Sequence, residues 1–156
     1  GTAPIGYFNI QSLNNIFNYL TDKGYTVIYK RPKNTEFPLD QNEMNTIHNR
    51  EVLQENVEGH GTISDYELTT WYDDVILLDD IINENPNMTY NEVQLNLFAN
   101  AEGFIGMSGG STLLLNLFKK QTINTIPYLD RDCIDMHNNK HTEFLNTIKK
   151  TFKGKI

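Results

Sequence analysis

The sequence contains one cysteine, Cys133, among its 156 residues. A single thiol excludes a disulfide within the chain and a Cys-rich zinc site. Long apolar runs are also missing: none reaches the roughly 18 residues of a membrane-spanning helix, and no basic segment followed by an apolar one marks a secretory signal. We therefore expect residues 1–156 to form one cytoplasmic domain without a transmembrane segment.

Basic residues are in the minority, because 13 lysines and arginines face 20 aspartates and glutamates, for a net charge of −7. A nucleic-acid-binding surface needs a basic stripe, so we expect no nucleic-acid partner. The positive charges that are present are grouped. One group, which follows a predicted strand, consists of Lys30, Arg31 and Lys33. The other lies at the C-terminus, where it is expected to complement the dipole of a last helical turn, and consists of Lys149, Lys150, Lys153 and Lys155.

Short apolar runs alternate along the chain with segments of helical periodicity. Residues 5–10, 26–29, 75–78, 104–107 and 123–126 have the composition of strands. This alternation predicts an α/β domain, namely a doubly wound, mostly parallel sheet of about five strands with helices on both faces. Ligands of such sheets bind beyond the carboxyl ends of the strands, so the loops after these strands are expected to meet at one edge.

Capping residues mark where the predicted helices begin. Ser12 is the predicted N-cap of the first helix, and Ser64 or Asp65 is predicted to cap a short helix further on. Thr89 is predicted to cap a helix over residues 90–99. Each of these side chains offers an oxygen to the first helical N–H groups, which have no partner within their own helix.

A small-residue turn lies between the predicted strand at 103–107 and an apolar helix. It consists of Ser108, Gly109, Gly110, Ser111 and Thr112. Paired glycines let the backbone approach a ligand closely, and the N–H groups of a helix start favour an anion. The turn lacks the Gly-Lys-Ser/Thr of the P-loop and the third glycine of the dinucleotide fingerprint. Two interpretations stay open here: a phosphate cradle, and a connector with a structural role alone.

The stretch from Tyr90 to Pro127 resembles the C-terminal, nucleotide-sugar-binding half of GT-B glycosyltransferases. The resemblance rests on Ala-Asn-Ala-Glu-Gly-Phe-Ile-Gly at 99–106, the turn at 108–112, and Lys-Gln-Thr-Ile-Asn-Thr-Ile-Pro at 120–127. The first half of the chain agrees only in the order of its elements. The resemblance implies a Rossmann-like, donor-binding domain of a metal-independent glycosyltransferase. Its donor would be a UDP- or GDP-sugar, with no cofactor, and a missing N-terminal domain would bind the glycan acceptor.

The same resemblance assigns roles to individual residues. It implies that the turn at 108–112 holds the donor diphosphate and that Arg31 or Lys30 neutralises the phosphates. The family's glutamate that binds ribose is replaced, because Leu114 and Leu115 occupy the corresponding positions. The candidate nucleoside contacts are Asp79, Tyr90, Glu92 and Asn116. No residue is identified as the catalytic base, and no metal site is expected.

Two other classes of function stay open. A flavodoxin-like or receiver-like signalling module would use acidic residues at strand ends, as Asp79 and Asp80 would be, although Pro127-Tyr128-Leu129 replaces its switch lysine. A free-standing interaction domain would use the Gly-Gly turn only as a connector. The spacing of Asp79 and Asp80 differs from the Asp-x-Asp metal motif of the other glycosyltransferase fold, which argues against a metal there.

Overall fold

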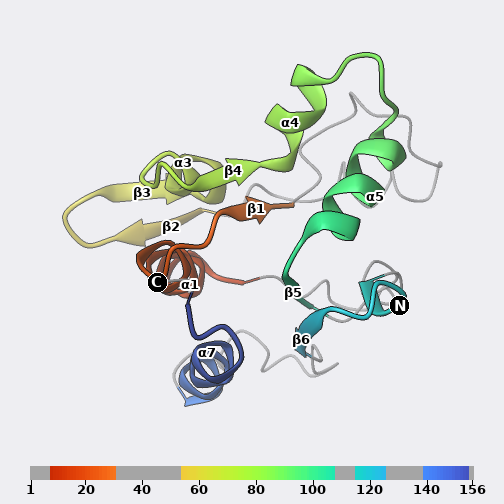
Figure 1. The fold of residues 1–156 in the computed structure, drawn as a ribbon. Coiled ribbons are helices and arrows are strands. Elements are labelled where there is room, and N and C mark those ends of the chain that lie inside the picture. Colours follow the sequence, from red (N-terminus) through yellow and green to blue (C-terminus); the bar gives the residue numbers. More distant parts are fainter. Residues whose placement is uncertain (1–7, 31–53, 108–114, 126–138, 155–156) are drawn as a thin grey trace, which may run out of the picture.

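The computed structural model describes residues 8–30, 54–107, 115–125 and 139–154 (Figure 1). The elements follow one another as α1 (Ile10–Asp22), β1 (Val27–Tyr29), β2 (Gln54–Val57), β3 (Gly61–Ser64), α3 (Asp65–Thr69), β4 (Val75–Leu77), α4 (Leu78–Glu84), α5 (Tyr90–Asn100), β5 (Gly103–Met107), β6 (Gln121–Thr125) and α7 (Asn139–Thr151). None of the helices in this described part combines the length and the apolar composition needed to cross a bilayer.

The strands of the described residues form three separate sheets of two strands each. β1 pairs with β4 and β5 pairs with β6, both in parallel, whereas β2 and β3 form an antiparallel hairpin. The prediction of one doubly wound, mostly parallel sheet of about five strands is therefore wrong. The apolar runs after residue 25 do form strands, but among the described residues no ladder joins the three-residue strands β1 and β4 to β5 or β6.

The first helix begins earlier than the sequence predicted. Asn9 is its N-cap, and Oδ1 of Asn9 accepts a hydrogen bond of 2.7 Å from the backbone N–H of Ser12. Ser12, the predicted cap, lies buried inside the first turn, and Ile10, placed by prediction in a strand, is the first helical residue. The difference has a simple cause. Asparagine and serine both cap helices well, and an apolar residue such as Ile10 is common both in strands and in helices.

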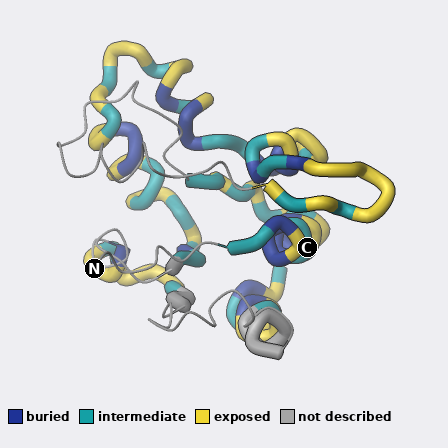
Figure 2. Tube along the Cα trace, turned by 180° about the vertical axis from the view of Figure 1, so that it is seen from behind, coloured by how far each residue is buried: buried dark blue, intermediate teal, exposed yellow. Residues whose placement is uncertain are grey.

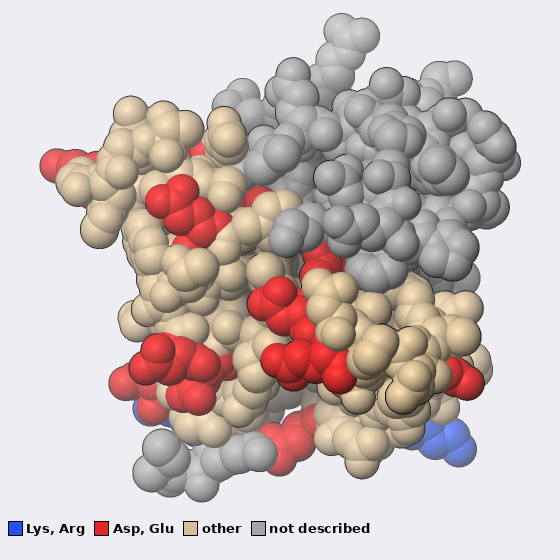
Figure 3. All heavy atoms as spheres, turned by 90° about the horizontal axis from the view of Figure 1, so that it is seen from above, with Lys and Arg blue, Asp and Glu red and all other residues tan. Residues whose placement is uncertain are grey.

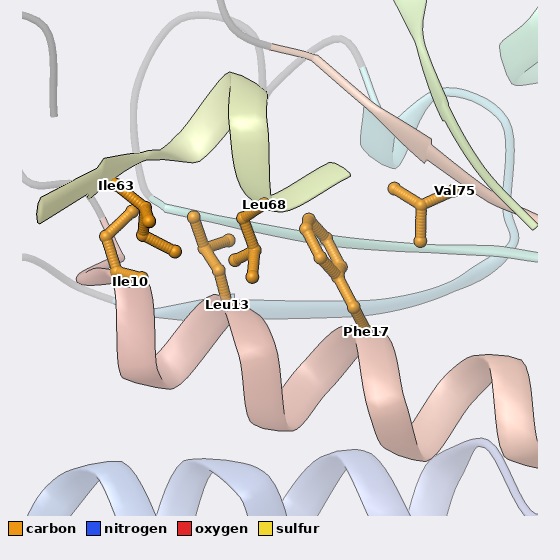
Figure 4. Packing of buried hydrophobic residues seen from close by; sticks show 6 residues of the cluster. All are labelled: Ile10, Leu13, Phe17, Ile63, Leu68 and Val75. Carbon is orange, nitrogen blue, oxygen red and sulfur yellow. The ribbon is translucent and has the colours of Figure 1, made fainter. Parts of the chain in front are cut away.

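One face of α1 packs against the hairpin, α3 and β4. These elements share a hydrophobic cluster of six buried residues: Ile10, Leu13, Phe17, Ile63, Leu68 and Val75. Figure 4 shows the first three pointing from α1 toward the other three. The Phe17 ring meets the Tyr29 and Tyr72 rings edge-on, with centroids 5.5 and 6.0 Å away. This cluster holds the β1–β4 pair on α1 and so fixes where the two strands end.

A second cluster joins α1 to the end of the chain. Ile16 and Leu20 of α1 are buried with Ile148 and Phe152 at α7. Val27 of β1 and Ile105 of β5 both pack against this cluster, so side chains hold the two parallel pairs near one another. The contact between the pairs is thus made by apolar burial in place of the continuous ladder that a doubly wound sheet would have.

The hairpin of β2 and β3 reaches outward from this core. Gly59 and Gly61 adopt φ of +81° and +75° in its turn, a region that glycine enters without strain. Figure 2 shows the far end of the hairpin as exposed, and Ile63 is its buried member. Ser64, one of the two predicted caps, then caps α3 by accepting a 3.1 Å hydrogen bond from the N–H of Glu67.

Candidate functional site

Strands β1 and β4 end at the same edge. Tyr29 and Leu77, the last residues of the two strands, are partners in the parallel register. The next residues, Lys30 after β1 and Leu78 at the start of α4, therefore leave the sheet at the same edge. In Figure 1 the two strands point toward the side of the molecule on which α5 lies. This edge is where the sequence predicted ligand-binding loops, and it holds the residues of the candidate site.

The ammonium group of Lys30 lies over an aromatic stripe of α5. Its Nζ is 6.0 Å from the centre of the Tyr90 ring and 5.8 Å from the centre of the Phe98 ring. Attraction between a cation and the faces of aromatic rings at such distances is weak, about 0.5–1 kcal/mol at exposed sites. The structure therefore brings together Lys30, a predicted phosphate contact, and Tyr90, a predicted nucleoside contact.

Tyr90 owes its position to a capping box at the start of α5. Oγ1 of Thr89 accepts a 3.2 Å hydrogen bond from the N–H of Glu92, and Oε2 of Glu92 accepts one of 2.8 Å from the N–H of Thr89. This confirms Thr89 as the predicted cap. It also gives the Glu92 carboxylate a structural partner, while its predicted role at the nucleoside stays a prediction.

Gln94 and Phe98 are the members of the site that the sequence analysis missed. Gln94 lies one helical turn after Tyr90 and one before Phe98, so the three share a face of α5. Only 7% of Gln94 is exposed, and within the described part of the chain its buried Oε1 has no hydrogen-bond donor. We refer to Lys30, Tyr90, Gln94 and Phe98 as the strand-end site. The signal in the sequence was a polar residue between aromatic residues at helical spacing.

Asp79 lies at the same edge, in the first turn of α4. It is 6% exposed, whereas its neighbour Asp80 is exposed to solvent. A carboxylate in the first turn of a helix is favoured by the helix dipole, which explains part of its burial there. Among the residues that the structure describes, no three histidines, cysteines, aspartates or glutamates lie grouped so as to hold a metal ion.

The remaining predicted contacts are only partly described. Arg31 and the turn of Ser108, Gly109, Gly110, Ser111 and Thr112 lie outside the described residues, directly after Lys30 and after β5. Asn116 is exposed. Its segment reaches the neighbourhood of the strand-end site, because the Phe118 ring lies 5.9 Å from the Phe98 ring, centre to centre.

Comparisons with known proteins identify no relative of this chain. The sequence matches no protein-family model, and no curated protein or solved structure is significantly similar to it. The case for a function therefore depends on the strand-end site and on the sequence runs that led to it.

Proposed function

We propose that this chain is the donor-binding domain of a metal-independent glycosyltransferase and binds a nucleoside diphosphate sugar at the strand-end site. The observation that carries the proposal is the position of Lys30, whose ammonium lies at the end of two parallel strands and over the first residue of α5. A diphosphate is attracted to that charge, and Tyr90 offers a flat apolar face beside it. The resemblance of residues 90–127 to GT-B glycosyltransferases supports the same ligand.

Because the molecule is acidic, the position of Lys30 indicates where an anionic ligand would bind. The chain carries a net charge of −7. Figure 3 shows acidic side chains spread over the described part of one face, with Lys and Arg only at its margin. An anionic ligand is repelled by such a surface in general, so it binds where a positive group overcomes the local field. Lys30 supplies that group at the strand-end site.

A donor-binding domain holds its ligand and leaves the transfer to a complete enzyme. In this proposal the glycan acceptor and the catalytic base belong to a second domain, which would close over the bound donor. The isolated chain is then expected to bind the nucleotide and to transfer no sugar. Its affinity depends on Lys30 and on the turn at 108–112, which stays a prediction from sequence.

Calorimetric titration with UDP, GDP and their sugar conjugates, in the presence of a chelator, tests the proposal. We expect binding without a divalent cation, and we expect Lys30→Ala to weaken it at least about tenfold by removing a charge-assisted contact worth about 1.5–3 kcal/mol. Lys153→Ala, at an exposed lysine that follows the end of α7, removes the same charge elsewhere and should leave the affinity unchanged. Binding of none of these nucleotides, or binding only with added Mg²⁺, contradicts the proposal.

A further inference from the structure

A buried hydrogen-bond acceptor lies in the middle of the strand-end site. Gln94 is more than nine-tenths buried, and its Oε1 is shielded from solvent without a donor among the described residues. The rings on either side of it along α5, Tyr90 and Phe98, are the two that Lys30 approaches. Gln94 therefore lies on the face of α5 whose two rings the ammonium group approaches.

An acceptor buried without a donor destabilises the protein by about 1–3 kcal/mol. Such groups are rare in native structures, and they commonly pair with an ordered water or ion or have a role in function. The position of Gln94 on α5 limits which chemical group of a ligand could donate a hydrogen bond to it. A phosphate has no proton to donate at neutral pH and pairs with Lys30, whereas the amide oxygen needs an O–H or N–H group close to that phosphate.

In a nucleotide sugar, the groups next to the diphosphate are sugars: the ribose on one side and the transferred sugar on the other. Both present hydroxyl groups, which are hydrogen-bond donors. We propose that Gln94 accepts a hydrogen bond from a sugar hydroxyl adjacent to the bound diphosphate and thereby determines which nucleotides the site selects. This inference rests on the proposed function and adds to it a residue that recognises the ligand by its hydroxyl groups.

The contacts of the Lys30 ammonium with the Tyr90 and Phe98 rings are weak ones. A full negative charge attracts an ammonium group more strongly than the faces of two aromatic rings do. An arriving diphosphate draws the Lys30 ammonium away from Tyr90 and Phe98. The ligand's hydroxyl then approaches the amide between the two rings, and the buried acceptor gains the donor that it lacks.

A cycle of protein and ligand variants tests this inference. Gln94→Met keeps the length of the side chain and removes the acceptor, and Gln94→Leu is a second variant with the same purpose. Each is titrated with UDP and GDP, with their 2′-deoxy and 3′-deoxy forms, and with UDP-glucose and its deoxy analogues. In the wild-type protein, loss of the recognised hydroxyl should weaken binding at least about tenfold, because the amide loses its donor again. In both variants the same pair of ligands should bind equally well.

The outcomes separate the two proposals. Sensitivity to a ribose hydroxyl or to a hydroxyl of the transferred sugar, present in the wild-type protein and lost in the variants, supports the inference and identifies the sugar. If the nucleotides bind and every deoxy penalty is the same in wild type and variants, this inference is overturned while the proposed function stands. If no nucleotide binds the wild-type protein, both are overturned. Far-ultraviolet circular dichroism of each variant verifies that it is folded.

Discussion

The hydroxyl group of Tyr29 donates a 2.8 Å hydrogen bond to Oδ2 of Asp65, 36 residues further along the chain. Asp65 is fully buried at the start of α3, and Tyr29 is the last residue of β1. The bond therefore joins the strand that precedes Lys30 to the helix that packs on α1. It links the position of the strand-end site to the interior of the protein.

Tyr29→Phe should lower the free energy of unfolding by about 1–3 kcal/mol, because a buried carboxylate loses a donor. Tyr19→Phe is the matched control, since the Tyr19 hydroxyl donates a 2.7 Å bond to the neutral backbone oxygen of Phe152. Loss of that bond should cost about 0.5–1.5 kcal/mol. Urea-induced unfolding measures both. A loss in Tyr29→Phe no larger than in Tyr19→Phe would show that the Asp65 carboxylate does not depend on this donor.

Gly103→Ala should destabilise the contact between β5, β6 and α7. A Cβ at this position would lie 2.5 Å from Cε1 of Phe152 and 2.6 Å from the backbone oxygen of Gln121. Since one of these neighbours is backbone in the parallel ladder, relief requires the strands to shift, and overpacking of this kind costs about 1–3 kcal/mol.

Gly59→Ala provides a comparison for this prediction. No atom lies within 4 Å of the Cβ that it would add, so its effect comes from the positive φ alone. We expect a cost of about 1 kcal/mol there, confined to the hairpin. Thermal unfolding compares the two variants, and an equal or smaller shift of the midpoint for Gly103→Ala would contradict the predicted clash.

Stability should fall at alkaline pH in a manner that depends on Tyr72. Desolvation by burial raises the pKa of Tyr72 above its ordinary 10.0, so the folded protein retains this proton at a pH where the unfolded chain has lost it. The protonated Tyr72 phenol therefore contributes fully to the free energy of unfolding below about pH 10. This contribution is lost as the pH rises from there through the raised pKa of the folded state. Urea unfolding between pH 8 and pH 11 should show a steeper decline for wild type than for Tyr72→Phe. Parallel declines would exclude a role for this phenol.

The capping box at α5 separates structural and binding roles of Glu92. Thr89→Ala removes the acceptor for the Glu92 N–H and should cost about 0.5–2 kcal/mol. Glu92→Gln preserves the box, because glutamine also serves at its third helical position, and should leave both the unfolding midpoint and the nucleotide affinity close to wild type. A clear loss of affinity in Glu92→Gln, with unchanged stability, would instead assign its carboxylate to the nucleoside.

The features that could be predicted from the sequence are those that depend on interactions between residues close together in the chain. The apolar runs that became β1, β4, β5 and β6 are visible in the chain, and Thr89 is identifiable because a cap acts within one turn of helix. Asn9 shows the limit of such local signals, since Asn9 and Ser12, three residues apart, could each serve as a cap, and the helix begins at the earlier one, with Ile10 buried in the core.

The pairing of strands was predicted wrongly because it depends on distant contacts. β1 and β5 come near one another through Val27 and Ile105, which pack against residues of α1 and α7 that are far apart in the sequence. Gln94 escaped prediction for the same reason. A glutamine on a helix usually faces solvent, and its burial follows from neighbours that only the folded chain brings to it.

The position of α1 between two hydrophobic clusters has a consequence for biosynthesis. One face of this helix contacts residues that follow soon after it, whereas the other waits for Ile148 and Phe152 near the end of the chain. A nascent polypeptide would therefore expose Ile16 and Leu20 until α7 has been synthesised. During that interval the apolar face is open to chaperones and to aggregation, and truncation before α7 should yield an insoluble product.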